Sequence, residues 1–173
     1  MTVDKLFSTL LYHGMVDDFD SIQNELQACY DQLNFERFDG VHWISVDPFK
    51  RDLIREYNMV NFENAILENV KKFSGQKSKI YSSWFVKFKT LDYGHVHNHG
   101  SADVSGVYYF KTSGTGQIFF QDPTPGLGSR TTRWSYDAVE GKMILFPGWL
   151  YHGIKSNTSD GDRVGVSFNL KFQ

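Results

Sequence analysis

The spacing of apolar residues changes near Lys79, and this change constrains the fold more than any other feature of the chain. Residues 80–88 alternate with a period of two, which is typical of a β-strand. Further runs of strand type follow, separated by segments that contain Gly or Pro. They cover residues 104–110, 117–120, 142–146 and 163–172. Several short strands in succession favour a β-sandwich or a jelly-roll barrel.

Before this point the apolar spacing is three to four residues, as in amphipathic helices. A first helix is expected after Asp17 and Asp18, and its apolar positions are Ile22, Leu26, Cys29 and Leu33. Asp47-Pro48 is a helix-start pair, with Asp as the cap and Pro in the first turn. Asn61 is expected to cap a further helix that ends at Ser74-Gly75.

Together these patterns predict a mainly β chain with a helical N-terminal part. We expect residues 1–78 to be mostly helical support and residues 79–173 to form the jelly-roll core, with the helices packed on one sheet. A length of 173 residues suits one domain with a single core.

Composition excludes several classes of protein. The apolar fraction is 40% and the charged fraction is 22%, which are ordinary values for a soluble domain. The formal net charge of −2 gives no general attraction to nucleic acid or to a membrane surface. No segment approaches the roughly 20 apolar residues of a membrane helix. The single cysteine, Cys29, is expected to be a buried, inert thiol, and a cytoplasmic location is the natural expectation.

A group of histidines carries the clearest chemical signal. His97 and His99 are separated by one residue, so they share a face of an extended segment. His152 follows the apolar run 142–146 and a Pro-Gly turn, and it can complete a three-point metal site. Spacing alone also allows the pair of His95 with His97, and it allows a solvated polar strand end. Asp103 offers a carboxylate for a site of two histidines and one carboxylate, although its spacing requires a turn.

The last predicted strand has one polar face. Arg163, Gly165, Ser167 and Asn169 alternate with apolar residues. This face either meets solvent or binds an anion inside the barrel. In the second case Arg163 would receive a carboxylate in a bidentate pair, and the Ser167 hydroxyl would donate to the same group.

Two other segments give structural expectations. Tyr108 and Tyr109 must point to opposite faces of their strand, so one is expected in the core and the other toward a pocket. Gly114-Thr115-Gly116 lacks the lysine and the following helix of a phosphate-binding loop. We therefore expect these residues to form a hairpin turn.

The pattern of motifs resembles a small family of 2-oxoglutarate- and iron(II)-dependent oxygenases of bacteria and phages. The family signature is His, any residue, His, a short spacer and then Ser-Gly-Val-Tyr-Tyr, which here spans residues 97–109. The resemblance extends over the second half of the chain. It includes Ser83-Trp84, residues 117–123, residues 141–147, His152 and residues 163–169.

This resemblance implies a double-stranded β-helix, also called a jelly roll. It implies that His97, His99 and His152 bind Fe(II), and that Arg163 pairs with the far carboxylate of 2-oxoglutarate. Tyr109 and Ser167 resemble hydrogen-bonding partners of that carboxylate in prolyl-hydroxylase-like relatives. His99 is a departure, because the wider superfamily has Asp or Glu there, and a site of three histidines also suits other divalent metals.

The implied activity is hydroxylation of a C–H bond with O2, releasing succinate and CO2. The substrate would be a small molecule or a peptide, and a prolyl residue follows from the resemblance alone. Two alternatives share the barrel. One is a cupin-like metal-dependent dioxygenase or isomerase that does not use 2-oxoglutarate, and the other is a non-catalytic ligand-binding barrel.

Overall fold

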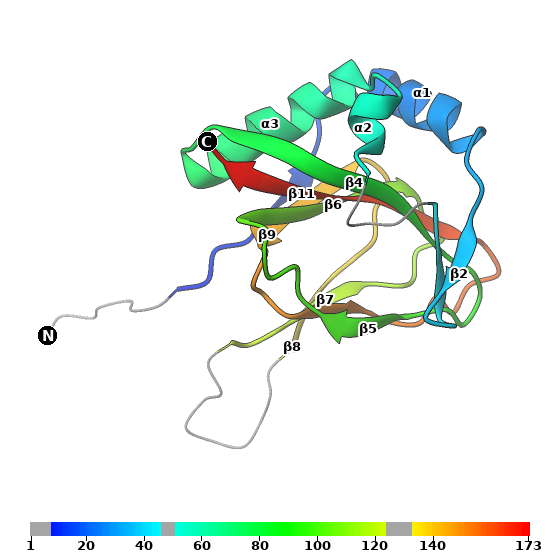
Figure 1. The fold of residues 1–173 in the computed structure, drawn as a ribbon. Helices are drawn as coiled ribbons and strands as arrows, with labels where there is room; N and C mark the ends of the chain where they lie inside the picture. Colours follow the sequence, from blue (N-terminus) through cyan, green and yellow to red (C-terminus); the bar gives the residue numbers. More distant parts are fainter. Residues whose placement is uncertain (1–7, 46–50, 124–132) are drawn as a thin grey trace, which may run out of the picture.

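Two facing antiparallel sheets form the barrel, as the sequence predicts. The computed structural model describes residues 8–45, 51–123 and 133–173 (Figure 1). The larger sheet has the strand order β1-β9-β6-β11-β4-β3-β2, and the smaller has the order β5-β10-β7-β8. The strands are β1 (Tyr12–Met15), β2 (Glu36–Phe38), β3 (His42–Ile44), β4 (Ser78–Phe88), β5 (Gly94–His97), β6 (Val104–Lys111), β7 (Ile118–Gln121), β8 (Arg133–Tyr136), β9 (Lys142–Pro147), β10 (His152–Ile154) and β11 (Arg163–Phe172).

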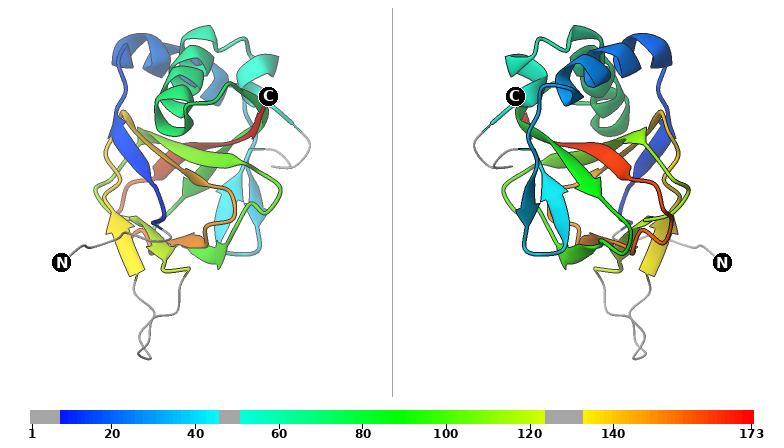
Figure 2. Two further views of the ribbon diagram at one scale, coloured as in Figure 1. Left: turned by 90° about the vertical axis from the view of Figure 1, so that its left-hand side faces the viewer. Right: turned by 90° about the vertical axis from the view of Figure 1, so that its right-hand side faces the viewer.

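The helices cover the outer face of the larger sheet, and the smaller sheet lies on the opposite side of that sheet (Figures 1 and 2). They are α1 (Phe19–Tyr30), α2 (Leu53–Glu56) and α3 (Val60–Ser74). Their apolar faces pack on the alternate residues of β11, such as Val166 and Phe168, which are completely buried. None of the helices in the described residues is long and apolar enough to cross a bilayer.

The helix starts differ from the sequence-based expectations. The start expected at Asp47-Pro48 lies outside the described residues. The third helix begins at Val60, so the expected cap at Asn61 is wrong. The Glu25 carboxylate of α1 instead accepts the backbone N–H groups of Asn61 and Phe62, at 3.0 Å each. A side chain distant in sequence thus satisfies amide groups that a local cap would otherwise bind.

Three strands come from the part of the chain that was expected to be mostly helical. Strand β1 pairs with β9 at one side of the larger sheet, and the hairpin β2–β3 extends it beyond β4. The hairpin turns at Asp39 and Gly40, which have φ of 48° and 70°. An Asp-Gly pair between short alternating segments is a recognised hairpin signal, and it could have revealed this element from sequence.

The prediction of a hairpin turn at Gly114-Thr115-Gly116 is also wrong. Strands β6 and β7 belong to different sheets, so this connection crosses from the larger sheet to the smaller one. Gly116, with φ of 72°, lies against the Arg163 side chain, and a Cβ atom there would be 2.9 Å from Arg163 Cδ. The glycine therefore leaves space for the arginine.

Cys29 is buried in α1, as expected, with 1% of its surface exposed. Burial, assisted by the nearby Glu56 carboxylate, raises the pKa of its thiol to about 12. Because the thiolate is the reactive form, this cysteine is inert at neutral pH.

Candidate active site

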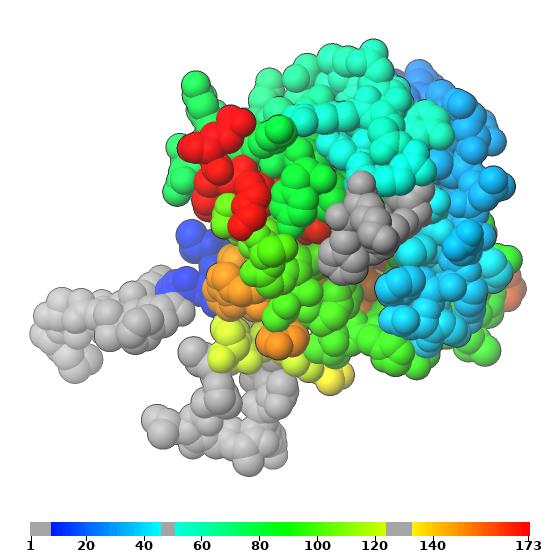
Figure 3. All heavy atoms as spheres, viewed as in Figure 1, coloured from blue at the N-terminus to red at the C-terminus, as the bar shows by residue number. Residues whose placement is uncertain are grey.

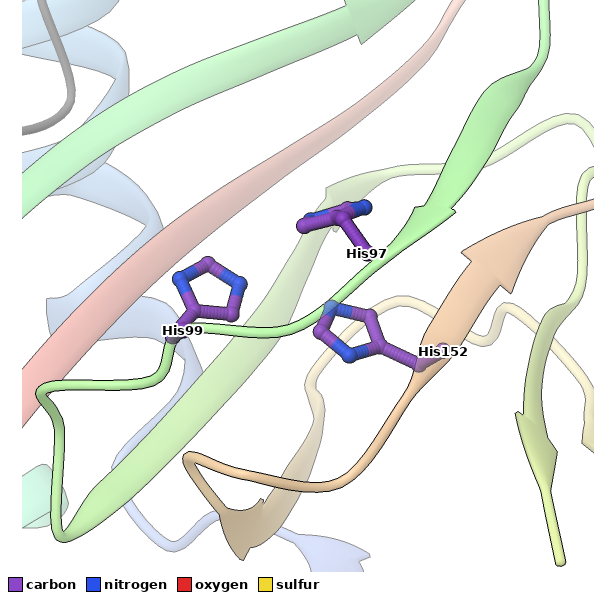
Figure 4. A group of neighbouring side chains, drawn as sticks. All are labelled: His97, His99 and His152. Carbon is purple, nitrogen blue, oxygen red and sulfur yellow. The ribbon is translucent and has the colours of Figure 1, made fainter.

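Two neighbouring strands of the smaller sheet bring the three histidines together. His97 ends β5 and lies directly opposite His152, the first residue of β10. His99 follows β5, and its backbone N–H donates to the Gly148 carbonyl at 2.8 Å. The candidate ligand atoms of the three side chains all lie within 4.8 Å of one another (Figure 4). The three rings therefore face a common point at which one ion could contact all of them.

Backbone carbonyl groups orient two of the rings. His97 Nδ1 is 2.8 Å from the His95 carbonyl oxygen, and His152 Nδ1 is 3.0 Å from the Leu150 carbonyl oxygen. A carbonyl oxygen only accepts, so Nδ1 must carry the proton in both rings. The lone pair of each Nε2 is then available, as in many histidine metal sites.

The site holds its buried imidazoles in the neutral form. Burial, followed by the neighbouring His97, lowers the pKa of His99 to about 3. Burial is also the main reason why the pKa of His152 is well below its usual value, and both neighbouring histidines add to the effect. Neutral imidazole is the form that binds a metal, so these residues need not lose a proton first.

Aromatic side chains surround the histidines. The Trp84 ring lies 5.9 Å from His99, and the Phe146 ring lies 4.6 Å from His152, measured between ring centroids. Phe120 lies 5.9 Å from His152 and packs against Phe146, 5.0 Å away. This shell limits access of water to the point where the rings meet.

The two alternative ligands lie apart from the group. The Asp103 carboxylate accepts the Phe172 backbone N–H at 2.9 Å and lies 3.5 Å from Lys171 Nζ. His95 is exposed and packs edge-on against Tyr93. Within the described residues, the group of possible metal ligands contains neither of them.

Arg163 approaches the site from the larger sheet. It begins β11, and its side chain is completely buried. Its guanidinium lies over the rings of Phe88 and Tyr109, 4.8 Å and 4.9 Å from their centroids. No described carboxylate pairs with it, and none of its three nitrogen atoms makes a well-formed hydrogen bond among the described residues, although the Tyr109 hydroxyl is near enough to interact with it. Burial lowers the pKa of Arg163, but a guanidinium keeps its charge in proteins. The polar face of β11 therefore lies inside the barrel and not toward solvent.

A small inner cavity of about 70 Å³ connects these groups. Arg163 and Ser167 line it together with the three histidines, and no Asp or Glu is among its described lining residues. Tyr109 is fully buried beside Arg163, and its hydroxyl has no hydrogen-bond partner there. Tyr108 points the other way and packs against Phe62 of α3, as the alternation predicts.

Two parts of the site were not found from sequence. The hairpin β2–β3 contributes His42 to the inner cavity, and its only sequence signal was the Asp39-Gly40 pair. Trp84, which the sequence indicated only through the family resemblance, lines the cavity beside His99.

Comparison with solved structures identifies the architecture. SnoN, a non-haem α-ketoglutarate-dependent epimerase from nogalamycin biosynthesis, has a TM-score of 0.74 at 12% identity, covering 94% of this chain and 78% of its own. HygX from Streptomyces hygroscopicus, solved with nickel, 2-oxoglutarate and hygromycin B, has a TM-score of 0.70 at 12% identity, covering 94% and 82%. A prolyl-4-hydroxylase from Pseudomonas putida has a TM-score of 0.60 at 14% identity, covering 97% and 95%.

The fold is thus the jelly roll of 2-oxoglutarate-dependent non-haem iron enzymes. Residues 82–169, just over half of the chain, match the family model described as "Putative 2OG-Fe(II) oxygenase". The chain belongs to this family. Comparison with curated protein sequences found no match.

Proposed function

We propose that this protein is an Fe(II)- and 2-oxoglutarate-dependent oxygenase that hydroxylates a C–H bond of a small molecule or peptide. In this proposal His97, His99 and His152 hold the metal. Arg163 binds the far carboxylate of 2-oxoglutarate, and Ser167 and Tyr109 assist it.

The observation that best supports this proposal is the state of Arg163. A buried cation without a partner is costly, on the order of several kcal/mol. The inner cavity that it lines also reaches the three histidines. A dicarboxylic acid with one end at the metal and the other at Arg163 would supply the missing counter-charge and hydrogen bonds.

The residues of the chain then have separate tasks. The guanidinium of Arg163 binds and orients the cosubstrate, while Phe88 and Tyr109 hold the guanidinium itself by stacking. Trp84 and Phe146 exclude water from the reacting centre. Iron with 2-oxoglutarate and O2 supplies the oxidising chemistry when bound, with release of succinate and CO2.

Hydroxylation is favoured over epimerisation by the residues around the site. SnoN has the same fold and is an epimerase, so the fold alone does not select the outcome. Epimerisation requires a group that returns a hydrogen atom to the substrate. Neither the described lining residues of the inner cavity nor those of the larger cavity beside it include a Tyr or a Cys that could supply one, and the buried Tyr109 hydroxyl is assigned to the cosubstrate.

An anaerobic titration tests the proposal. Protein loaded with Fe(II) is mixed with 2-oxoglutarate, and the visible charge-transfer band of the chelate is followed. We expect the band to saturate and, after addition of O2, succinate to form. Metal binding with O2 consumption but without this band would instead support the cupin-like alternative. Absence of metal binding would instead support the alternative of a non-catalytic ligand-binding barrel.

Paired variants test the third ligand. We expect His99→Ala to weaken metal binding at least about 100-fold, since loss of groups that merely support ligands already costs roughly 10- to 100-fold. Asp103→Asn is expected to leave metal affinity unchanged, because its carboxylate binds the Phe172 backbone. Calorimetric titration with Ni(II) gives both affinities. Loss of metal affinity in Asp103→Asn but not in His99→Ala would show that Asp103 is the third metal ligand.

A further inference from the structure

A second, larger cavity of about 260 Å³ adjoins the first. Its walls come from the hairpin β2–β3, from Trp84 of β4 and from the segment that includes β5. In the space-filling view the hairpin and the β5 segment lie side by side on one face of the molecule (Figure 3). We call this space the outer cavity. The residues that line both cavities are His42, Trp84, His97 and His99.

The shared residues place the outer cavity on the solvent side of the proposed metal site. His97, which lines both cavities, is exposed, whereas Arg163 lies only on the inner cavity and is completely buried. If the inner cavity holds the cosubstrate, as proposed above, the outer cavity is the remaining approach to the same centre. It is therefore the candidate substrate site.

The pleat of the hairpin decides which side chains enter this cavity. Phe38 lies opposite His42 in the register, and both line the cavity, as does Ile44. Arg37 lies on the other face, where its guanidinium is 2.7 Å from the Asp92 carboxylate. The alternation thus directs apolar and neutral groups inward and turns the cation of the hairpin away.

The described lining of the outer cavity offers a carboxylate but no cationic Lys or Arg side chain. Asp39 is the single charged residue among its described lining residues, and no Lys or Arg is among them. Asp39 is exposed at the turn of the hairpin and has no ion-pair partner within the part of the chain that the structure describes. An anionic substrate would therefore find no described cation to bind, whereas an ammonium group would find a carboxylate.

We propose that the outer cavity binds a substrate with an apolar body and a protonated amine, the amine at Asp39 and the apolar end toward the three histidines. This inference rests on the proposed function. Phe38, Ile44 and Trp84 supply the apolar contact surface. A divalent ion held by the three histidines repels an ammonium group, so the amine lies at the turn and the apolar end faces the metal.

Three matched probes test this inference: phenethylamine, phenethyl alcohol and hydrocinnamate. Each is added to protein loaded with Mn(II) and 2-oxoglutarate, and the paramagnetic relaxation of its protons is measured by NMR. We expect the amine to bind about two- to five-fold more tightly than the alcohol, the range for an exposed ion pair. Hydrocinnamate is expected to bind most weakly. In the bound amine, ring protons should relax faster than the methylene protons beside nitrogen.

Asp39→Asn is the informative variant. Asn adopts the left-handed conformation of this turn readily, so the hairpin is preserved while the charge is removed. We expect the preference for the amine to disappear. Asp20→Asn, an exposed change of the same kind on α1, should retain it.

The outcomes separate this inference from the proposed function. Tightest binding of hydrocinnamate, equal binding of the three probes, binding of none, or fastest relaxation beside nitrogen would overturn the amine assignment. Saturation-transfer NMR measures the same preference without a metal. Failure of Mn(II) or 2-oxoglutarate to bind, detected by electron paramagnetic resonance and calorimetry, would overturn the proposed function instead.

Discussion

Arg163→Met should weaken 2-oxoglutarate binding by at least about 30-fold, since truncating one partner of a buried, hydrogen-bonded charge pair costs about 2–5 kcal/mol. Metal affinity should stay nearly unchanged, because the guanidinium is not among the possible metal ligands. Calorimetric titration of the Ni(II)-loaded protein with 2-oxoglutarate measures the first effect. Titration with Ni(II) alone measures the second.

The same variant also has an expected effect on stability. In the free protein the guanidinium is buried without a hydrogen-bond partner among the described residues, and Met replaces it with an apolar side chain of similar length. We expect the Tm of the free protein to stay equal or to rise, and the stabilisation by 2-oxoglutarate to disappear.

Lys171→Met is the matched control, because it removes a positive charge from the exposed end of the same strand. It should leave 2-oxoglutarate binding intact. Loss of metal binding in Arg163→Met, or retention of full 2-oxoglutarate affinity, would show that the assigned role of Arg163 is wrong.

His152→Ala should abolish metal binding at micromolar concentrations and, with it, metal-dependent decarboxylation of 2-oxoglutarate. The ring is buried against Phe146 and Phe120, and the group of possible ligands among the described residues holds only His97 and His99 besides it. We expect the metal affinity to fall at least about 100-fold, because removal of a group that only supports a ligand already costs roughly 10- to 100-fold. Metal content after dialysis, measured by elemental analysis, provides the check.

His95→Ala serves as the control for this experiment. His95 lies two positions before His97 and was the alternative partner allowed by spacing, but its exposed ring lies outside the group of possible ligands. Its carbonyl, which orients His97, remains in the variant. Unchanged metal content in His152→Ala, or loss in His95→Ala, would reverse the assignment.

Local patterns in the sequence were sufficient for several features. The period of two predicted the long strands β4, β6 and β11 closely, because the pleat of a strand depends only on neighbouring residues. The same rule correctly predicted that the side chains of Tyr108 and Tyr109 point to opposite faces of their strand. Motif resemblance indicated the family, which the match over residues 82–169 confirms.

Short elements that depend on distant contacts were missed. Strands β1 and β3 exist because β9 and β4 offer them backbone partners. The start of α3 depends on Glu25, a residue of another helix. Local spacing does not contain such contacts, so a propensity-based prediction placed a cap at Asn61 instead.

By itself, then, the sequence determined the strand faces and the residues able to bind a metal or an anion. Alternation shows that Arg163 and Ser167 share a face, but it does not show which face is enclosed. Only the packing of the smaller sheet against the larger one placed that face inside the barrel. The pairing of β5 with β10 likewise brought His152 to His97 and left Asp103 at the edge, because ligand distances are set by strand register and not by sequence separation.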